Sequence, residues 1–251
     1  MVRSGLVHAV RTLTVVPVPG REDAGAKYRA LPWFAVVGCA VGVVHYFAGR
    51  LLGAVDLPIM LPLRGIFLAV LTYGITGALH LDGLGDFVDA FGTLHDTEKT
   101  RTILKDPHLG TFGIAAVVVA ILWRIELYRV LMINDRLTWL IFTFGISRLL
   151  QAVLLAFLPY AGGRQGKAGG YRATNVVRVI LLGQAVALIA VPGYWEGVAA
   201  AAIPLLAGGV AVLLVCLKCR RRLEGITGDC VGASSELFEL VFLTGGMVCL
   251  E

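Results

Sequence analysis

Charged residues are scarce in this sequence. Only 16% of its 251 residues are Asp, Glu, Lys or Arg, 57% are hydrophobic, and the mean hydropathy is +0.81. A soluble domain carries about a quarter charged residues and a smaller apolar share. The composition therefore excludes an ordinary soluble domain and indicates an integral membrane protein. The apolar runs are continuous, which favours helices over the alternating strands of a membrane barrel.

Other common features are also missing. No Pro/Ser-rich linker divides the chain, so we expect one domain over residues 1–251. Residues 6–18 lack a clean apolar core followed by a cleavage site, which favours a short amphipathic surface segment over a signal peptide. The five cysteines are scattered, and the single CxxC at residues 216–219 has no further zinc ligands at suitable spacing. We expect structural thiols and no disulfide framework.

Long apolar runs dominate the chain. Six of them approach the ~20 residues that span a bilayer, and a shorter seventh contains Gly245 and Gly246. They cover residues 32–53, 62–81, 110–131, 137–158, 177–195, 197–217 and, for the seventh, 237–250. We therefore predict an all-α polytopic membrane protein with six to seven transmembrane helices. Whether the seventh run spans the membrane stays open.

Basic residues mark one side of the membrane. Sixteen of the 22 Lys and Arg residues lie before the first run or in the loops after the second, fourth and sixth runs. The positive-inside rule places the N-terminus and these loops in the cytoplasm. We expect the chemistry at this cytoplasmic face of the cell membrane, because a transporter would need polar groups near the midplane of several spans.

Three aspartates follow the second apolar run. Asp82, Asp86 and Asp89 stand at i, i+4 and i+7, so a helix would present them on one face. Like charges on one stripe repel each other, and a divalent cation held by carboxylate oxygens is the simplest compensation. We expect a metal site here. The alternative is a solvated acidic turn just outside a membrane helix.

A second polar segment lies in the loop after the sixth run. Asp229 and Glu236 are seven residues apart and share a face if the segment is helical. Thr227 offers a hydroxyl, and Gly228 lets the backbone approach a ligand closely. We favour a binding site. The compatible alternative is a glycine-rich turn that caps the last helix, with Ser234 as the N-cap.

Basic side chains accompany these carboxylates. Lys105 precedes Pro107, which marks the turn into the third run, where a helix N-terminus attracts phosphate. Arg164 belongs to a basic, glycine-rich loop that either binds anions or only sets the topology. Arg148, near the middle of the fourth run, needs an anionic partner, either a chain carboxylate or a substrate phosphate. Carboxylates that hold magnesium, beside basic groups that neutralise phosphate, are typical of phosphoryl transfer.

Four motifs, in this order and at this spacing, resemble cobalamin synthase, the adenosylcobinamide-GDP ribazoletransferase family. They are HLDGLGDFVDAFG at residues 80–92, KDPHLGTFG at 105–113, Ser147-Arg148, and GITGDCVGASSELFE at 225–239. The resemblance runs from about residue 5 to the C-terminus, and the first and last motifs are the most specific. The family more often has alanine at the position of Gly85 and small polar residues at those of Phe87 and Val88. These departures affect local packing and spare the carboxylates.

The resemblance implies the last step of nucleotide-loop assembly in cobalamin synthesis. In that family α-ribazole, or its 5′-phosphate, attacks adenosylcobinamide-GDP, releases GMP and forms adenosylcobalamin or its phosphate. Magnesium is the implied cofactor and the cytoplasmic (inner) membrane the implied location. The implied partners are the two substrates and the lipid bilayer, with no nucleic acid. Homo-oligomerisation and association with other cobalamin-synthesis proteins stay open.

The resemblance also implies roles for individual residues. Lys105 and Arg148 would stabilise charge on the phosphates and on the departing GMP. Asp89 would be either a metal ligand or the base for the ribazole hydroxyl. The implied metal set is Asp82, Asp86, Asp89, Asp229 and Glu236. The implied substrate-binding set is His80, Lys105, Arg148, Arg164, Thr227 and Gly228.

Other functions are compatible with parts of the pattern. A CDP-alcohol phosphotransferase also uses membrane-face aspartates and magnesium, but its motif has an arginine shortly after the first Asp-Gly, and none follows Gly83 in this stretch. A cation-coupled transporter would carry carboxylates deep inside its spans. A scaffold for other cobalamin-pathway proteins would leave the spacing of the aspartates unexplained.

Overall fold

The computed structural model describes residues 2–21, 25–55, 60–92, 96–161, 171 and 173–249. Within these ranges the regular structure is helical, apart from one isolated bridge between Tyr160 and Ile226. The helices are α1 Val2–Leu13, α2 Ala26–Gly53, α3 Leu61–Thr76, α4 Leu79–Phe91, α5 Thr97–Ile103, α6 Thr111–Ile133, α7 Trp139–Phe157, α8 Asn175–Glu196, α9 Val198–Leu223 and α10 Gly228–Val248. The predicted all-α class is confirmed.

Several helices are long and apolar enough to cross a membrane. They are α2, α7, α8, α9 and α10, and the bent pair of α3 and α4 raises the number to as many as six. The chain is therefore a multi-pass membrane protein, as predicted, but with five to six candidate spans among the described residues instead of six to seven; α6, which covers the predicted run 110–131, is not one of them. The predicted span 62–81 is not one straight helix, because α3 and α4 meet at 89°.

The last helix begins earlier than the apolar run predicts. α10 is continuous over 21 residues from Gly228, where the run suggested a start near residue 237. Its N-cap is Thr227, whose hydroxyl accepts the N–H of Cys230 at 3.3 Å. The prediction of Ser234 as the N-cap was wrong: Ser234 lies one turn further in and donates to the Cys230 carbonyl. A hydropathy pattern does not detect the start of α10, because the first residues there are Thr, Gly and Asp, which are not hydrophobic.

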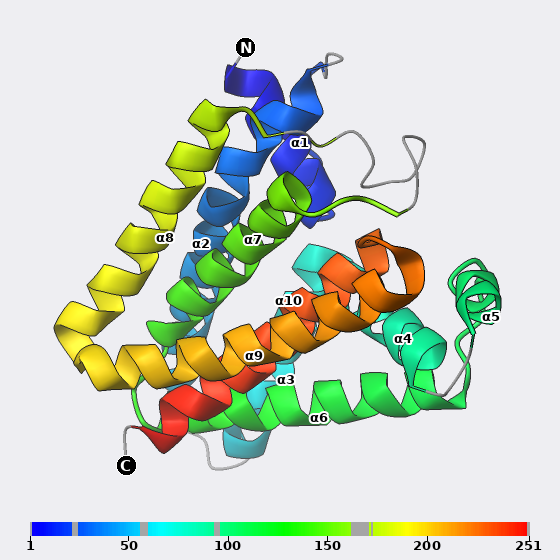
Figure 1. Cartoon of the computed structure of the whole chain (residues 1–251). Helices are drawn as coiled ribbons and strands as arrows, with labels where there is room; N and C mark the ends of the chain where they lie inside the picture. The colour runs from blue at the N-terminus through cyan, green and yellow to red at the C-terminus, as the bar shows by residue number, and fades with distance from the viewer. Residues whose placement is uncertain are drawn as a thin grey trace.

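The helices form two groups that spread apart (Figure 1). α2, α7 and α8 make up one group, and α6, α9 and α10 the other. α2 packs along α7, and α9 packs along α10. The groups join where α8 turns into α9 at Gly197; from there α2, α7 and α8 extend toward α1, and α6, α9 and α10 extend toward α4 and α5 (Figure 1). The short helix α4 therefore lies at the open end, packed on both α6 and α10.

A left-handed bend places α4. Gly77 and Ala78 have φ values of 61° and 54°. Glycine adopts this conformation freely, whereas alanine pays about 1–2 kcal/mol for it. Next to the bend, the Val15 amide donates to the Ile75 carbonyl at 2.8 Å, which ties the segment after α1 to the end of α3. The bend turns α4 across the bundle and brings its first turn to α10.

Glycines let α4 and α10 approach closely. A Cβ built on Gly83 would lie 3.0 Å from the Asp229 carbonyl oxygen and 3.2 Å from its Cα. A Cβ on Gly232 would lie 3.3 Å from the Cα of His80. The two backbones are therefore in contact at the point where Asp229 begins α10.

A buried ionic network fixes α10 against α6 and α7. Arg124 of α6 donates to Glu236 at 2.5 Å and to Glu239 at 2.8 Å. Arg148 of α7 pairs with Glu239 and donates to Ser235 at 3.0 Å. The four charged side chains are at most 4% exposed. The two positive and two negative charges balance, which lowers the cost of burying them.

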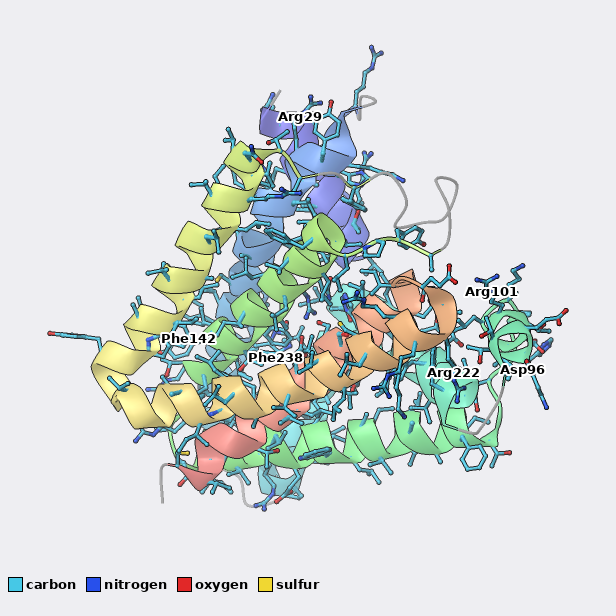
Figure 2. All side chains as sticks on the ribbon, in the orientation of Figure 1. Arg29, Asp96, Arg101, Phe142, Arg222 and Phe238 are labelled. Atoms are coloured by element: carbon cyan, nitrogen blue, oxygen red, sulfur yellow. A yellow bond between two sulfur atoms is a disulfide. The ribbon has the colours of Figure 1, made fainter. Side chains whose placement is uncertain are left out.

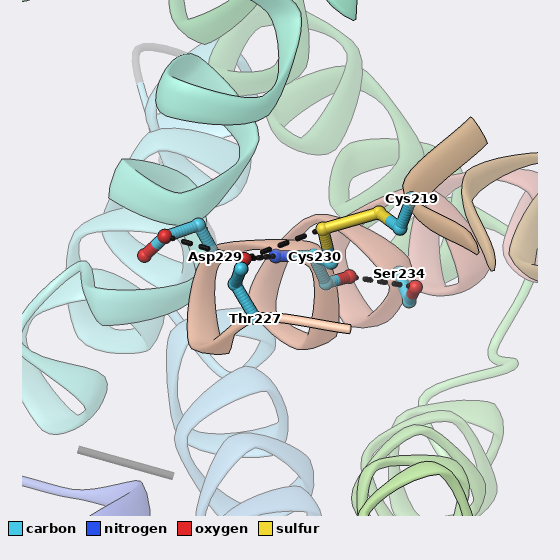
Figure 3. The surroundings of a disulfide bond; sticks show 5 residues. All are labelled: Cys219, Thr227, Asp229, Cys230 and Ser234. Atoms are coloured by element: carbon cyan, nitrogen blue, oxygen red, sulfur yellow. Dashed lines mark hydrogen bonds between the residues drawn. A yellow bond between two sulfur atoms is a disulfide. The ribbon is translucent and has the colours of Figure 1, made fainter. Parts of the chain in front are cut away.

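A disulfide joins the end of α9 to the first turn of α10 (Figure 3). It links Cys219 to Cys230, and both residues are buried. The expectation of free thiols was wrong for this pair, because α9 and α10 pack as a hairpin that brings residues 11 apart in sequence together. Cys39, Cys216 and Cys249 are free thiols, as predicted.

Gly83→Ala should lower the temperature of thermal unfolding in detergent more than Gly85→Ala does. Both changes gain the same helix propensity, so their difference isolates the contact. A methyl at Gly83 meets the backbone of Asp229, and such overpacking costs about 1–3 kcal/mol. A methyl at Gly85 meets the side-chain ends of Leu109 and Val117, which can rotate away. Equal unfolding temperatures would contradict the close approach of α4 and α10.

Glu239→Gln should destabilise the protein by about 3–5 kcal/mol, because it leaves two buried arginines with one carboxylate. The matched control is Glu126→Gln. Glu126 pairs with Arg129 on the surface, where such a pair contributes about 0–1 kcal/mol. Chemical unfolding of both variants in detergent measures the difference, and a similar loss in the two would refute the role of the network.

Candidate active site

A large open cavity lies between α4, α5 and the start of α10. Its volume is about 780 Å³. The residues around it come from four segments distant in sequence. They are Asp82 and Asp86; Arg101, Leu104, Lys105, Asp106 and Pro107; Tyr160 and Ala161; and Leu223, Thr227, Gly228 and Asp229. The Ala161 amide donates to the Ile226 carbonyl at 2.9 Å, which joins the end of α7 to the segment before α10.

Carboxylates from two helices face this cavity. Asp82 and Asp86 stand one turn apart on α4, and Asp229 lies in the first turn of α10, where Thr227 donates to it at 3.4 Å. Across the described part of the chain, no three His, Cys, Asp or Glu side chains converge closely enough to hold an ion by themselves. Magnesium usually keeps several waters and takes one or two carboxylates plus substrate phosphates. The carboxylates present fit that mode of binding and do not form an all-protein cage.

The opposite wall of the cavity is basic. Arg101 comes from α5, and Lys105 follows that helix. Figure 2 shows Arg101 and Arg222 on the same side of the molecule, and Arg222 lies over the ring of Phe91. Carboxylates facing guanidinium and ammonium groups across one cavity can bind a phosphate together with a divalent cation.

Asp106 adds a further negative charge beside Lys105. The backbone N–H of His108 donates to its carboxylate at 3.0 Å, and Nδ1 of His108 lies 2.8 Å from the same oxygen. These hydrogen bonds, the backbone one first, lower the pKa of Asp106 below its usual value. The same hydrogen bonds hold the turn that carries Lys105 and Pro107.

Asp89 does not reach the cavity, although it shares a helical face with Asp82 and Asp86. One carboxylate oxygen accepts the Gly110 amide at 2.6 Å, and the other accepts the Gly113 amide at 2.8 Å. Asp89 thus caps the N-terminus of α6 from a neighbouring helix. This corrects the expectation that the three aspartates converge on one metal. It also means that the N-terminus of α6, expected to attract phosphate, already holds a carboxylate.

Two other predicted residues lie in the core. Glu236 shares a helix with Asp229, but it is buried against Arg124 and away from the cavity. The anionic partner of Arg148 is a chain carboxylate, Glu239, which answers the question that the sequence left open. Neither Glu236 nor Arg148 lines the cavity, so the geometry supports them as residues that hold the fold.

Only some of the remaining predicted site residues line the cavity. Lys105, Thr227 and Gly228 line the cavity, as the site prediction requires. His80 lies behind it, buried next to Asp82. Arg164 lies outside the described residues.

Sequence reasoning missed some cavity residues. In the sequence, Arg101 is one of the sixteen basic residues that mark one side of the membrane, and its position one helical turn before Lys105 is the signal that links it to the site. Tyr160 and Leu223 carry no sequence signal, because only the packing of α7 beside the α9–α10 hairpin brings them to the site.

Comparison with known proteins identifies the family. The model of the cobalamin-5-phosphate synthase (CobS) family matches residues 5–247. The adenosylcobinamide-GDP ribazoletransferase of Chlorobium phaeobacteroides (strain BS1) is 33% identical and covers 98% of each chain. That of Chlorobaculum parvum is 36% identical over 94% of this chain and 92% of its own, and that of Pseudomonas entomophila is 33% identical over 94% and 96%. No solved structure matches the chain. The family match and these near full-length relatives confirm the resemblance carried by the four motifs, and the chain belongs to the cobalamin-5-phosphate synthase family.

Proposed function

We propose that this protein is a membrane-bound adenosylcobinamide-GDP ribazoletransferase. It joins α-ribazole, or its 5′-phosphate, to adenosylcobinamide-GDP, releases GMP and completes the nucleotide loop of cobalamin. The observation that carries the proposal is the single cavity in which aspartates of α4 and α10 face Arg101 and Lys105. The names of the near full-length relatives agree with it.

The donor diphosphate binds in this cavity. Arg101 and Lys105 neutralise its oxygens from one wall. Thr227 and Gly228 stand at the N-terminus of α10, where the amides and the helix dipole attract a phosphate group. Asp82, Asp86 and Asp229 would hold Mg²⁺ on the other wall, one or two of them as direct ligands and the others through water. When bound, the ion neutralises the phosphate oxygens and the charge that develops on GMP.

The reaction is a displacement at phosphorus. The ribazole hydroxyl oxygen forms a bond to the phosphorus attached to cobinamide, and the bond from that phosphorus to the bridging oxygen breaks. GMP leaves with this oxygen, and a carboxylate of the cavity takes the hydroxyl proton. We assign this role to a carboxylate other than Asp89, because Asp89 does not line the cavity and caps α6 instead.

We further propose that the site faces the cytoplasm. The support is the distribution of basic residues, since α5 and the end of α9, both at the cavity, carry Lys and Arg. An epitope inserted after Lys99 should be inaccessible to antibody in spheroplasts and become accessible after permeabilisation. Labelling in intact spheroplasts would reverse the assigned orientation.

Asp82→Asn should abolish GMP release from adenosylcobinamide-GDP and α-ribazole, because it removes a charge that binds magnesium. EDTA should stop the wild-type reaction, and added Mg²⁺ should restore it. The matched control is Asp135→Asn: Asp135 lies outside the cavity in an exposed pair with Arg50, and its φ of 54° suits asparagine. The control should keep wild-type turnover, and both variants should elute as folded protein in size exclusion.

Full activity in Asp82→Asn would refute its role. A wild-type protein that releases CMP from CDP-diacylglycerol, and no GMP from adenosylcobinamide-GDP, would replace the proposed function with that of a CDP-alcohol phosphotransferase.

A further inference from the structure

A second, smaller cavity lies behind the carboxylates. Its volume is about 130 Å³, and it lies between α1, α2, α4, α7 and the start of α10. It shares Asp82, Gly228 and Asp229 with the large cavity. The first turns of α4 and α10 therefore form a partition with one cavity on each side.

Two buried polar atoms at this cavity have no partner. His80 and Gln151 both line it and are 4% and 3% exposed. Nδ1 of His80 and Nε2 of Gln151 have no hydrogen-bond partner. A buried polar atom without a partner is costly, so this pair indicates a ligand with a complementary polar atom.

Most of the remaining lining is apolar and suits a flat ring, although the hydroxyl side chains of Thr12 and Tyr171 also contribute to it. Leu13, Phe34, Leu155 and Val231 supply apolar surface from four different helices. The volume is somewhat below that of a cavity known to bind a single benzene ring, roughly 150 Å³, so it admits one ring of a fused-ring base. Apart from the aspartates of the partition, no charged side chain lines this cavity among the described residues.

We propose that the small cavity binds the aromatic base of the acceptor nucleoside, with His80 and Gln151 hydrogen-bonding its ring nitrogen. This inference rests on the proposed function and assigns it a second subsite. The acceptor belongs to the class of nucleosides with a largely apolar fused-ring base, and its 5′-phosphate would carry the same base. With the base held here, the ribose lies beside Asp82 and Asp229.

The position of the subsite suits the chemistry. In a displacement at phosphorus the attacking and leaving oxygens lie on opposite sides of the phosphorus atom. An acceptor bound behind the partition approaches the phosphate from one side, and GMP leaves into the large cavity on the other side. The carboxylates stand between the two, where they can take the hydroxyl proton.

Two other occupants suit the cavity less well. A guanine base presents two N–H donor groups on one edge and favours a carboxylate, but the only carboxylates that line this cavity among the described residues are Asp82 and Asp229, to which the proposed function assigns Mg²⁺. A lipid acyl chain would leave Nδ1 of His80 and Nε2 of Gln151 unsatisfied.

The test is equilibrium dialysis of α-ribazole against the detergent-purified full chain, without the donor, so that the result does not depend on turnover. Gln151→Leu should weaken binding about five- to tenfold, which corresponds to one buried hydrogen bond. Leu155→Phe fills the cavity and should weaken binding at least as much.

Both variants should keep the KM for adenosylcobinamide-GDP within about twofold of the wild-type value. Arg101→Ala, the matched control in the large cavity, should raise that KM and leave the affinity for α-ribazole unchanged.

The possible outcomes separate the subsite from the function. Unchanged α-ribazole affinity in both Gln151→Leu and Leu155→Phe, with wild-type GMP release intact, would overturn the subsite and leave the proposed function standing. A larger effect of Gln151→Leu on the donor KM than on α-ribazole affinity would reassign the cavity to the guanine base. Absence of both GMP release and α-ribazole binding in the wild type would reject the function itself.

Discussion

The close contact between α4 and α10 is the constraint on which the site depends. Asp82 and Asp229 are separated by 147 residues of chain, and they share a cavity only because the backbones touch at Gly83 and Gly232. Any larger side chain at Gly83 would meet the Asp229 backbone. The bend at Gly77 and Ala78 is the other half of the constraint, because a straight continuation of α3 would carry Asp82 away from α10.

The buried ion network supplies the rigidity that this contact needs. α10 has carboxylates at positions 229, 236 and 239, and the structure uses them for two purposes. Asp229 stands at the solvent-facing start of the helix, while Glu236 and Glu239 descend into the core and meet two arginines. In a low-dielectric interior such a network has few alternative pairings, because any displacement leaves a charge unpaired. The ion pairs thereby fix the register of α10 against α6 and α7. This register also fixes the position of Asp229 along the axis of α10.

The sequence predicts most of the membrane spans and part of the site correctly, but it does not predict which neighbour each side chain contacts. Apolar runs reveal the spans because a bilayer demands length and hydrophobicity. The helical spacing of the aspartates correctly places Asp82 and Asp86 together. The same spacing fails for Asp89, because a face of α4 wide enough for three aspartates contacts both the cavity and the N-terminus of α6. Periodicity describes one helix, and the neighbour that each side chain meets depends on the packing of others.

Two further features lay beyond pattern reasoning for the same reason. The partner of Arg148 could be a substrate or a chain carboxylate until α7 and α10 were placed side by side, and Glu239 then decided it. The disulfide between Cys219 and Cys230 depends on the tight α9–α10 hairpin, and no spacing rule marks that pair among five cysteines.

The partition between the two cavities explains why a membrane fold suits this chemistry. A phosphate donor needs charged groups and water-accessible space, which the wide cavity by α5 supplies. The proposed subsite for the base lies behind α4, between helices packed for a bilayer, and needs no separate domain. The carboxylates must then stand where the two environments meet, at the first turns of α4 and α10. Those turns are the polar ends of otherwise apolar helices, so the boundary between charged cavity and apolar interior coincides with the place where the reacting groups have to meet.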